Sequence, residues 1–336
     1  MRGMRLSRIA PVLLMLIVTT STIAAFAGVS YWAGSRTEPL LRFLDGSRAP
    51  TIDEAIIAYP MEYALHSTEA NDVIFLGDST CHDGIDPRRL SGFTSYNLGS
   101  VGGVGPAAIA LTAQAYLKHH PKPRAVVLCL SPFRLDNDPG SAGGQLPFRF
   151  IATYGPGVPG AVSWLDSTGY FVKRGAAGLL AAKSVTWREM RDLPLLGMKS
   201  ETYHTLEAKT VKTRGFFDLP GEHGSRWTVE VPKKRLVHEA WTDGVERLAL
   251  ACRESGVTLV IRFGPVWDGV SGSRDFTQLE DWADRMESKR NGLKFSRPLV
   301  LAWDRSVMWD ALHVNHAGVD KFMPLVAKEV QAALVK

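Results

Sequence analysis

The sequence predicts an α/β domain built on a doubly wound parallel sheet flanked by helices. Short strand-like segments alternate with longer segments of helical composition, the order that places parallel strands next to each other with helices between them. The chain of 336 residues is 45% hydrophobic and 22% charged, as expected for a folded protein with a buried core. An apolar N-terminal segment precedes this domain, and an irregular insertion follows its third strand.

The N-terminal segment predicts membrane targeting. Arg2, Arg5 and Arg8 precede residues 9–34, which contain no charged side chain. About 20 apolar residues are enough for a helix to span a bilayer. Because arginines before such a helix stay on the cytoplasmic side, we expect the chain after Trp32 to be extracytoplasmic, in a periplasm or at a cell surface.

Two outcomes of this targeting remain open. Residues 1–34 form a cytoplasmic stub with a retained transmembrane helix, or they form a signal peptide. Ala25-Phe26-Ala27 resembles a signal-peptidase site, and cleavage there would release a secreted protein. The apolar run is longer than a typical signal core of roughly 7–15 residues, which favours the retained anchor.

The strand and helix predictions follow in order along the chain. Short apolar runs predict strands at residues 73–76 and 125–130. Residues 94–98 and 257–261 are further short strand candidates, with a weaker fifth at 299–302. Helical composition predicts helices at residues 107–119, 236–255 and 317–335. The run at 125–130 is apolar throughout, as central parallel strands are. Sites in such sheets lie at the carboxyl ends of the strands.

Three regions of different composition make up the rest. We expect residues 35–70 to be a linker that leads into a catalytic domain at 71–336, with an insertion at about 136–232. The insertion is rich in glycine and proline but also carries many aromatic residues, so it is not a disordered linker. The insertion either lines the site or binds substrate, or it forms a structural subdomain.

Charge and cysteine content exclude some functions. The net charge is +5, but the basic residues are scattered rather than gathered in a stripe, so we expect no nucleic-acid partner. An acidic polysaccharide or a phospholipid surface would suit this charge. The cysteines, Cys81, Cys129 and Cys252, fit no metal-binding spacing.

Two short motifs carry residues suited to nucleophilic catalysis. Ser79 comes directly after the first predicted strand and a glycine turn. A serine hydroxyl is a weak nucleophile unless a base lies next to it. His313, which lies between the fifth predicted strand and the closing helix, is a candidate base, and Asp310 is a candidate to orient its imidazole.

These motifs resemble those of the SGNH (GDSL-like) hydrolases. Gly77-Asp78-Ser79 is similar to the first motif of that superfamily, Gly102 to the glycine after the second strand, and Asp310-Ala-Leu-His313 to the last motif. The resemblance implies an SGNH/flavodoxin-like fold, a catalytic triad of Ser79, Asp310 and His313, and an oxyanion hole formed by the N–H groups of Ser79 and Gly102. It implies no cofactor and no metal.

The chain departs from this family at the third motif. No Gly-x-Asn-Asp follows residues 125–130, so the third oxyanion donor is Asn137 on a longer loop, or Arg134 in its place. The chain resembles membrane-anchored alginate-acetylation proteins in its anchor, motif order and altered third motif. This implies a serine esterase or O-acyltransferase that acts on O-acetyl groups of an extracytoplasmic polysaccharide through an acyl-Ser79 intermediate. Its partners would be an acylated carbohydrate, the membrane and other envelope proteins.

Two other functions also fit the sequence. A non-catalytic envelope binding or assembly protein on a degenerate SGNH scaffold remains open, and so does a metal-dependent hydrolase. The second would use Asp310, His313 and His316, with further ligands from His82, Asp83 and Asp86. Residues 103–108 match a dinucleotide-binding glycine pattern, but no acidic residue follows within 107–135 to bind a ribose.

Overall fold

The centre of the molecule is a five-stranded sheet in which every neighbouring pair of strands is parallel. Its strands are β1 (Val73–Gly77), β2 (Ser95–Gly99), β3 (Ala125–Leu130), β4 (Thr258–Phe263) and β6 (Leu293–Phe295). Their order is β2-β1-β3-β4-β6, which is typical of doubly wound α/β proteins. This confirms the predicted α/β class with a parallel sheet.

The structure is a computed structural model that describes most of this domain. The described residues are 14–22, 24–25, 52–101, 105–135, 150–151, 153–155, 196–219, 224, 227, 237–271, 276–289 and 292–335.

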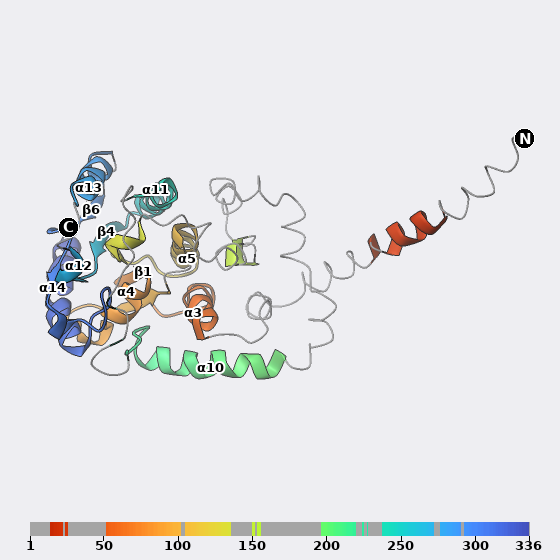
Figure 1. Cartoon of the computed structure of the whole chain (residues 1–336), viewed down its shortest axis with the longest axis horizontal. Helices are drawn as coiled ribbons and strands as arrows, with labels where there is room; N and C mark the ends of the chain where they lie inside the picture. The colour runs from red at the N-terminus through yellow and green to blue at the C-terminus, as the bar shows by residue number, and fades with distance from the viewer. Residues whose placement is uncertain are drawn as a thin grey trace, which may run out of the picture.

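Helices cover both faces of the sheet (Figure 1). On one face lie α3 (Ile52–His66), α5 (Gly105–His119) and α11 (Glu239–Glu254); on the other lie α4 (Ser79–Gly84) and α14 (His316–Leu334). The described chain also contains α10 (Leu196–Lys212), α12 (Asp268–Ser271), α13 (Thr277–Lys289), three 3-10 helices, η1 (Pro87–Arg89), η2 (Pro132–Arg134) and η5 (Arg305–Val307), and a second small sheet of β5 (Val266–Trp267) and β7 (Ala302–Trp303).

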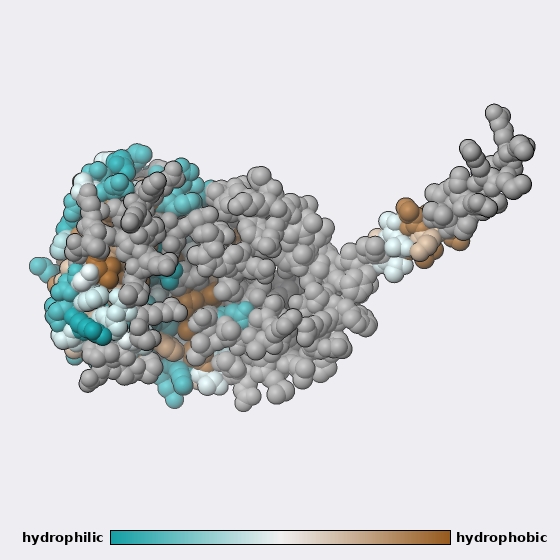
Figure 2. Space-filling view, viewed as in Figure 1, coloured by the Kyte–Doolittle hydropathy of each residue, from teal (hydrophilic) through white to brown (hydrophobic). Residues whose placement is uncertain are grey.

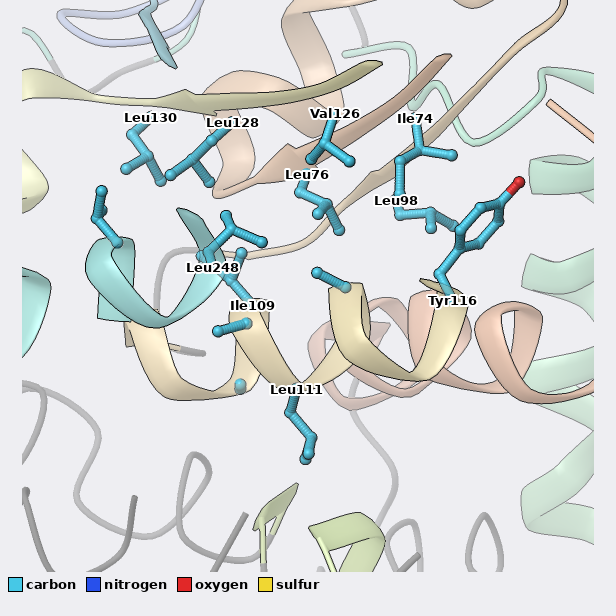
Figure 3. Close-up of a cluster of buried hydrophobic side chains, with 14 of the residues drawn as sticks. Ile74, Leu76, Leu98, Ile109, Leu111, Tyr116, Val126, Leu128, Leu130 and Leu248 are labelled. Atoms are coloured by element: carbon cyan, nitrogen blue, oxygen red, sulfur yellow. The ribbon is translucent and has the colours of Figure 1, made fainter. Parts of the chain in front are cut away.

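Side chains of the strands alternate between two hydrophobic cores. Leu76 of β1 and Leu128 of β3 point toward α5 and its Ile109, as Figure 3 shows. Phe75, the neighbour of Leu76, packs on the opposite face with Phe322 of α14. This period of two follows from strand geometry. Because both faces are covered, the central strands β1 and β3 are buried along their whole length.

The fifth strand of the sheet is not the one predicted. Residues 293–295 form β6 beside β4, whereas residues 299–301 are not in a strand and Ala302 belongs to β7 of the small sheet. β6 has only three residues, and Lys294 at its centre is exposed. Short strands that carry a charge are typical of sheet edges. Because β6 contains no run of apolar residues, the sequence does not predict it.

The predicted linker contains a core helix. Residues 52–66, within the 35–70 segment, form α3, which packs against α5 and α10. Its Ile57, Ala58, Met61 and Ala64 are buried in the same core as β1. The α/β domain therefore begins before residue 71, and this part of the segment is not a linker.

The predicted insertion includes regular structure. Residues 196–212 form α10, a helix of 17 residues, so this part of the 136–232 segment is not irregular. The chain after α10 then runs along the free edge of β2, where the N–H of Asn97 donates to the carbonyl of Arg214 at 2.9 Å. The insertion is thereby anchored on the sheet at the middle of β2.

The predicted membrane anchor lies largely outside the described residues. Within it, residues 14–22 and 24–25 are helical, and the apolar side chains of residues 14–18 are exposed, seen as a brown patch in Figure 2. No helix in the described part of the chain is long and apolar enough to cross a membrane. The predicted cleavage site at residues 25–27 is described only at Ala25.

Candidate active site

The turn between β1 and α4 delivers Ser79 to the carboxyl edge of the sheet. Gly77 ends β1 with a φ of +154°, a conformation that residues with a side chain rarely adopt. A Cβ atom added there would lie 1.7 Å from the backbone oxygen of Cys129 on β3. Glycine is therefore required at this turn, and Ser79 follows as the first residue of α4.

Asp78 links this turn to the end of the neighbouring strand β3 through hydrogen bonds. Its Oδ1 accepts a hydrogen bond from the N–H of Thr80 at 2.9 Å, the pattern of a helix N-cap. Its Oδ2 accepts a hydrogen bond from the N–H of Ser131, directly after β3, at 3.0 Å. Both carboxylate oxygens are thus used to hold backbone, and Asp78 positions the segment that carries Ser79.

A closed loop before α14 holds Asp310 and His313. Met308 and Val314 pair as an antiparallel bridge that closes the loop. Inside it, Asp310 Oδ1 accepts hydrogen bonds from the N–H groups of Leu312 and His313, both at 2.8 Å. Aspartate side chains commonly stabilise turns in this way. The loop therefore fixes the carboxylate and the imidazole relative to each other.

The structure brings Ser79, His313 and Asp310 together. His313 Nε2 lies 2.8 Å from Ser79 Oγ, although the two residues are 234 positions apart in the sequence. His313 Nδ1 lies 2.9 Å from both carboxylate oxygens of Asp310. Since a carboxylate only accepts hydrogen bonds, Nδ1 carries the proton in the neutral ring, and Nε2 accepts the hydrogen bond from the serine hydroxyl.

Burial and charge act in opposite directions on the pKa of His313. Burial of the imidazole alone would lower its pKa, but the hydrogen bond and negative charge of Asp310 raise it, with a smaller contribution from Asp83 and Asp78. The raising effects are larger in sum, so the pKa of His313 lies above its ordinary value. The imidazole is therefore a stronger base than a free histidine side chain.

The expected oxyanion donors are only partly described. The N–H of Ser79, at the first position of α4, has no acceptor among the residues that the structure describes. Gly102 and Asn137 lie outside the described residues. Arg134 is half-buried in η2, and its guanidinium makes no hydrogen bond or ion pair with any part of the chain described.

The residues proposed as metal ligands do not converge. His316 Nε2 pairs with Asp218 at 3.1 Å on the surface, and its side chain is 61% exposed. Asp86 instead binds Arg88 and Arg89. Over the described ranges, no three His, Cys, Asp or Glu side chains are grouped as they would be to hold a metal ion.

The end of the insertion borders the site. The N–H of Gly224 donates to the carbonyl of Trp309 at 2.6 Å, and the Trp309 ring meets the His313 ring edge-on at 6.4 Å between centroids. On the α4 side, the ring of Phe217 stacks on that of His82 at 5.0 Å. Described residues of the insertion therefore lie beside both the triad loop and α4.

Sequence reasoning missed the arrangement of His82 and Asp83, which it treated only as possible metal ligands. The two side chains form their own pair, with His82 Nδ1 2.7 Å from Asp83 Oδ1, and both are buried. Their positions three and four residues after Ser79 would have indicated a shared helix face if α4 had been predicted.

Comparison with known proteins gives no relative for this chain: no family model, no curated protein and no solved structure matches it. The chemistry of the site is therefore derived from its own geometry.

Proposed function

We propose that this chain is an SGNH-type serine acyl-transfer enzyme, an esterase or an O-acetyltransferase. Its substrates would be ester-linked acyl groups, most readily O-acetyl groups, of an extracytoplasmic polysaccharide. The observation that carries the proposal is the continuous hydrogen-bonded chain from Ser79 Oγ through His313 to Asp310. A base placed on the serine hydroxyl and oriented by a buried carboxylate is the arrangement that activates serine nucleophiles.

The first half-reaction forms the acyl-enzyme. Ser79 Oγ attacks the carbonyl carbon of the ester while its proton passes to His313 Nε2. Asp310 stabilises the resulting imidazolium through Nδ1. The bond between the carbonyl carbon and the alcohol oxygen then breaks, and the alcohol leaves with the proton from His313, so that the acyl group remains on Ser79.

The second half-reaction reverses these steps with a new hydroxyl. His313 takes a proton from water or from a sugar hydroxyl, whose oxygen attacks the acyl carbon. The bond between the acyl carbon and Ser79 Oγ then breaks, and the proton returns from His313 to Ser79 Oγ. Water makes the protein an esterase, and a sugar hydroxyl makes it a transferase. The insertion residues beside the triad loop support a role in presenting the acceptor and restricting water.

Charge on the developing oxyanion would be held by N–H donors. The N–H of Ser79 has no acceptor among the described residues, which supports its role as one donor. Gly102 is proposed as the second by resemblance to the SGNH family. The N–H of Ser131, at the end of β3, is already bonded to Asp78. The third donor would be the side chain of Asn137 or of Arg134, and the Arg134 guanidinium makes no hydrogen bond or ion pair within the described chain.

The proposal also includes an extracytoplasmic location. The support is the N-terminal sequence, in which three arginines precede a charge-free apolar run, residues 9–34. A retained anchor would hold the domain at the membrane surface, close to polysaccharide during export. The net charge of +5 is compatible with an acidic polysaccharide.

The test compares wild type with Ser79→Ala on an aryl acetate, with and without an acceptor polysaccharide. We expect Ser79→Ala to lose at least about 1,000-fold in kcat, because an unassisted water replaces the activated serine. Ser288→Ala, an exposed serine on α13, is the matched control and should retain wild-type activity. Equal activity in wild type and Ser79→Ala would refute the nucleophile. Acetyl found on the polysaccharide would identify a transferase, and free acetate alone an esterase.

A further inference from the structure

A second imidazole–carboxylate pair lies one helical turn after Ser79. His82 Nδ1 is 2.7 Å from Asp83 Oδ1, and the two side chains are 6% and 9% exposed. Residues three and four positions apart on a helix share a face, so His82 and Asp83 lie on the side of α4 that carries Ser79. The proposed mechanism uses neither residue.

The His82 imidazole is held in one orientation. His82 Nδ1 is hydrogen-bonded to Asp83 Oδ1, and the ring of Phe217 stacks on the imidazole with 5.0 Å between the ring centroids. The backbone of His82 is bonded on both sides: its N–H donates to Asp78 at 3.1 Å, and its carbonyl accepts from Phe217 at 3.1 Å. The ring therefore has little rotational freedom left to lose when it binds a ligand.

Nε2 of His82 has no hydrogen-bond partner in the part of the chain that the structure describes. Because the Asp83 carboxylate can only accept, the neutral ring carries its proton on Nδ1 and a lone pair on Nε2. No residue in the described ranges bonds to Nε2, nor is Nε2 among the fully enclosed side-chain atoms that lack a partner. It is thus an oriented acceptor without a partner in the described chain, on a ring that Asp83 holds through Nδ1 as Asp310 holds His313.

The two imidazole–carboxylate pairs interact electrostatically. Asp83 is among the charges that raise the pKa of His313, which indicates that it lies within electrostatic range of the triad. Three residues separate Ser79 from His82, a rise of about 4.5 Å along α4. A single sugar ring spans a distance of this size, so one substrate can reach both positions.

We propose that His82, oriented by Asp83, accepts a hydrogen bond from a free hydroxyl of the substrate close to the ester that Ser79 attacks. The substrate class is therefore an acyl ester of a polyhydroxylated compound, a carbohydrate with unmodified hydroxyls beside the acylated one. This inference rests on the proposed function and specifies its substrate. A site built to bond a hydroxyl discriminates against an analogue without it, because the acceptor is then left unpaired.

The test uses two substrates that differ by one hydroxyl. They are a mono-O-acetylated methyl hexoside and its deoxy counterpart, which lacks the hydroxyl next to the ester, and the readout is the ratio of their kcat/KM values. We expect wild type to prefer the hydroxylated ester by about tenfold or more. His82→Phe keeps a flat ring against Phe217 but removes Nε2, and it should lower this ratio at least fivefold. An unchanged ratio overturns the proposal.

Two further variants separate binding from folding. His316→Phe makes the same substitution at an exposed histidine at the start of α14, and it should leave the ratio at the wild-type value. If His82→Phe does not fold, Asp83→Asn provides the test, since loss of the carboxylate frees the ring to carry its proton on Nε2. A ratio in Asp83→Asn equal to that of wild type also overturns the proposal.

The failure of this inference differs from the failure of the proposed function. Ser79→Ala that remains as active as wild type on both esters refutes the enzyme mechanism itself. Ser79→Ala without activity, together with a ratio that does not depend on His82, refutes only the hydroxyl subsite.

Discussion

At Asp310, burial and hydrogen bonding act in opposite directions on one carboxylate. Burial alone would raise its pKa, whereas the hydrogen bond and charge of His313 and the N–H groups of Leu312 and His313 lower it. The result is a pKa below the ordinary aspartate value, so the group stays ionised. An ionised Asp310 keeps the proton of His313 on Nδ1 and the lone pair of Nε2 on Ser79.

Replacement of this carboxylate should impair catalysis far more than folding. In Asp310→Asn the side-chain carbonyl still accepts hydrogen bonds from the N–H groups of residues 312 and 313. The new amide N–H, however, can donate to His313 Nδ1, so that the proton of the imidazole moves to Nε2. We expect kcat to fall by about 10⁴-fold. Steady-state rates on an aryl acetate, with the thermal unfolding midpoint as a folding check, measure this. A loss below tenfold in a folded variant would show that Asp310 does not orient the base.

The pH profile should report the raised pKa of His313. Only the neutral imidazole accepts a proton, so kcat/KM falls as pH drops through the pKa of His313. Because Asp83 contributes to raising that pKa, Asp83→Asn should move the acidic limb of the profile to lower pH. Asp281→Asn, an exposed carboxylate on α13, should leave the limb in place. An acidic limb that keeps its pH midpoint in Asp83→Asn, or moves to higher pH, would contradict this electrostatic coupling.

At the scale of elements, the β1–α4 turn depends on glycine for two reasons, conformation and space. Gly256, which follows α11, also has a positive φ, +71°, but an added Cβ there meets nothing within 4 Å. Gly256→Ala should therefore cost about 1 kcal/mol for conformation alone. Gly77→Ala adds the clash with the β3 backbone, so we expect a loss of about 3 kcal/mol or more.

Urea unfolding of both variants measures this difference. Gly77→Ala should also lose activity if it folds, because any shift of the turn displaces Ser79 from His313. Equal stability of the two alanine variants would mean that the backbone of the turn can move to make room for a Cβ atom, which would contradict the requirement for glycine at position 77.

The elements differ in how well sequence predicts them. β1, β2, β3 and β4 lie within a residue or two of the predicted segments. β1 and β3 are apolar throughout, as buried parallel strands are, whereas β2 is buried but carries Ser95 and Asn97. α3 was missed for a related reason: it is buried on nearly all sides and contains Pro60, so its sequence lacks the one-sided helical pattern. The edge strand β6 offers only three residues.

At the scale of the whole molecule, a buried ion pair joins α14 to the sheet. Arg262 of β4 has a side chain that is 2% exposed, and its Nη2 lies 2.8 Å from Glu329 of α14. Burial lowers the pKa of Arg262, while the charge of Glu329 acts to raise it. Since α14 begins three residues after His313, this pair helps to hold the helix on which the triad loop depends.

Removal of one partner should cost more than removal of both. Glu329→Ala leaves Arg262 charged and buried, and we expect a loss of about 3–5 kcal/mol in unfolding free energy. Arg262→Met combined with Glu329→Leu should be close to wild type, because well-packed apolar side chains need no partner. Denaturant unfolding of both proteins tests this. A single variant as stable as the double variant would contradict the role of the pair.

The candidate site was predictable where it follows local motifs. Each triad residue lies next to a predicted strand or helix. The family resemblance predicted that Ser79 and His313, which are 234 positions apart in the sequence, act together. The link from Asp78 to Ser131 and the pairing of His82 with Asp83 were not predictable. Both depend on the phase of α4 and on the spacing of β1 and β3, which appear only in three dimensions.

The central claim is that Ser79 is a nucleophile activated by His313. The most direct test is the intact mass of the protein after brief exposure to a fluorophosphonate, which phosphonylates activated serines, followed by peptide mapping. We predict one added phosphonyl group on Ser79, with labelling greatly slowed in His313→Ala and absent at this position in Ser79→Ala. A protein that stays unlabelled, or one labelled at another serine with Ser79 free, would contradict the account.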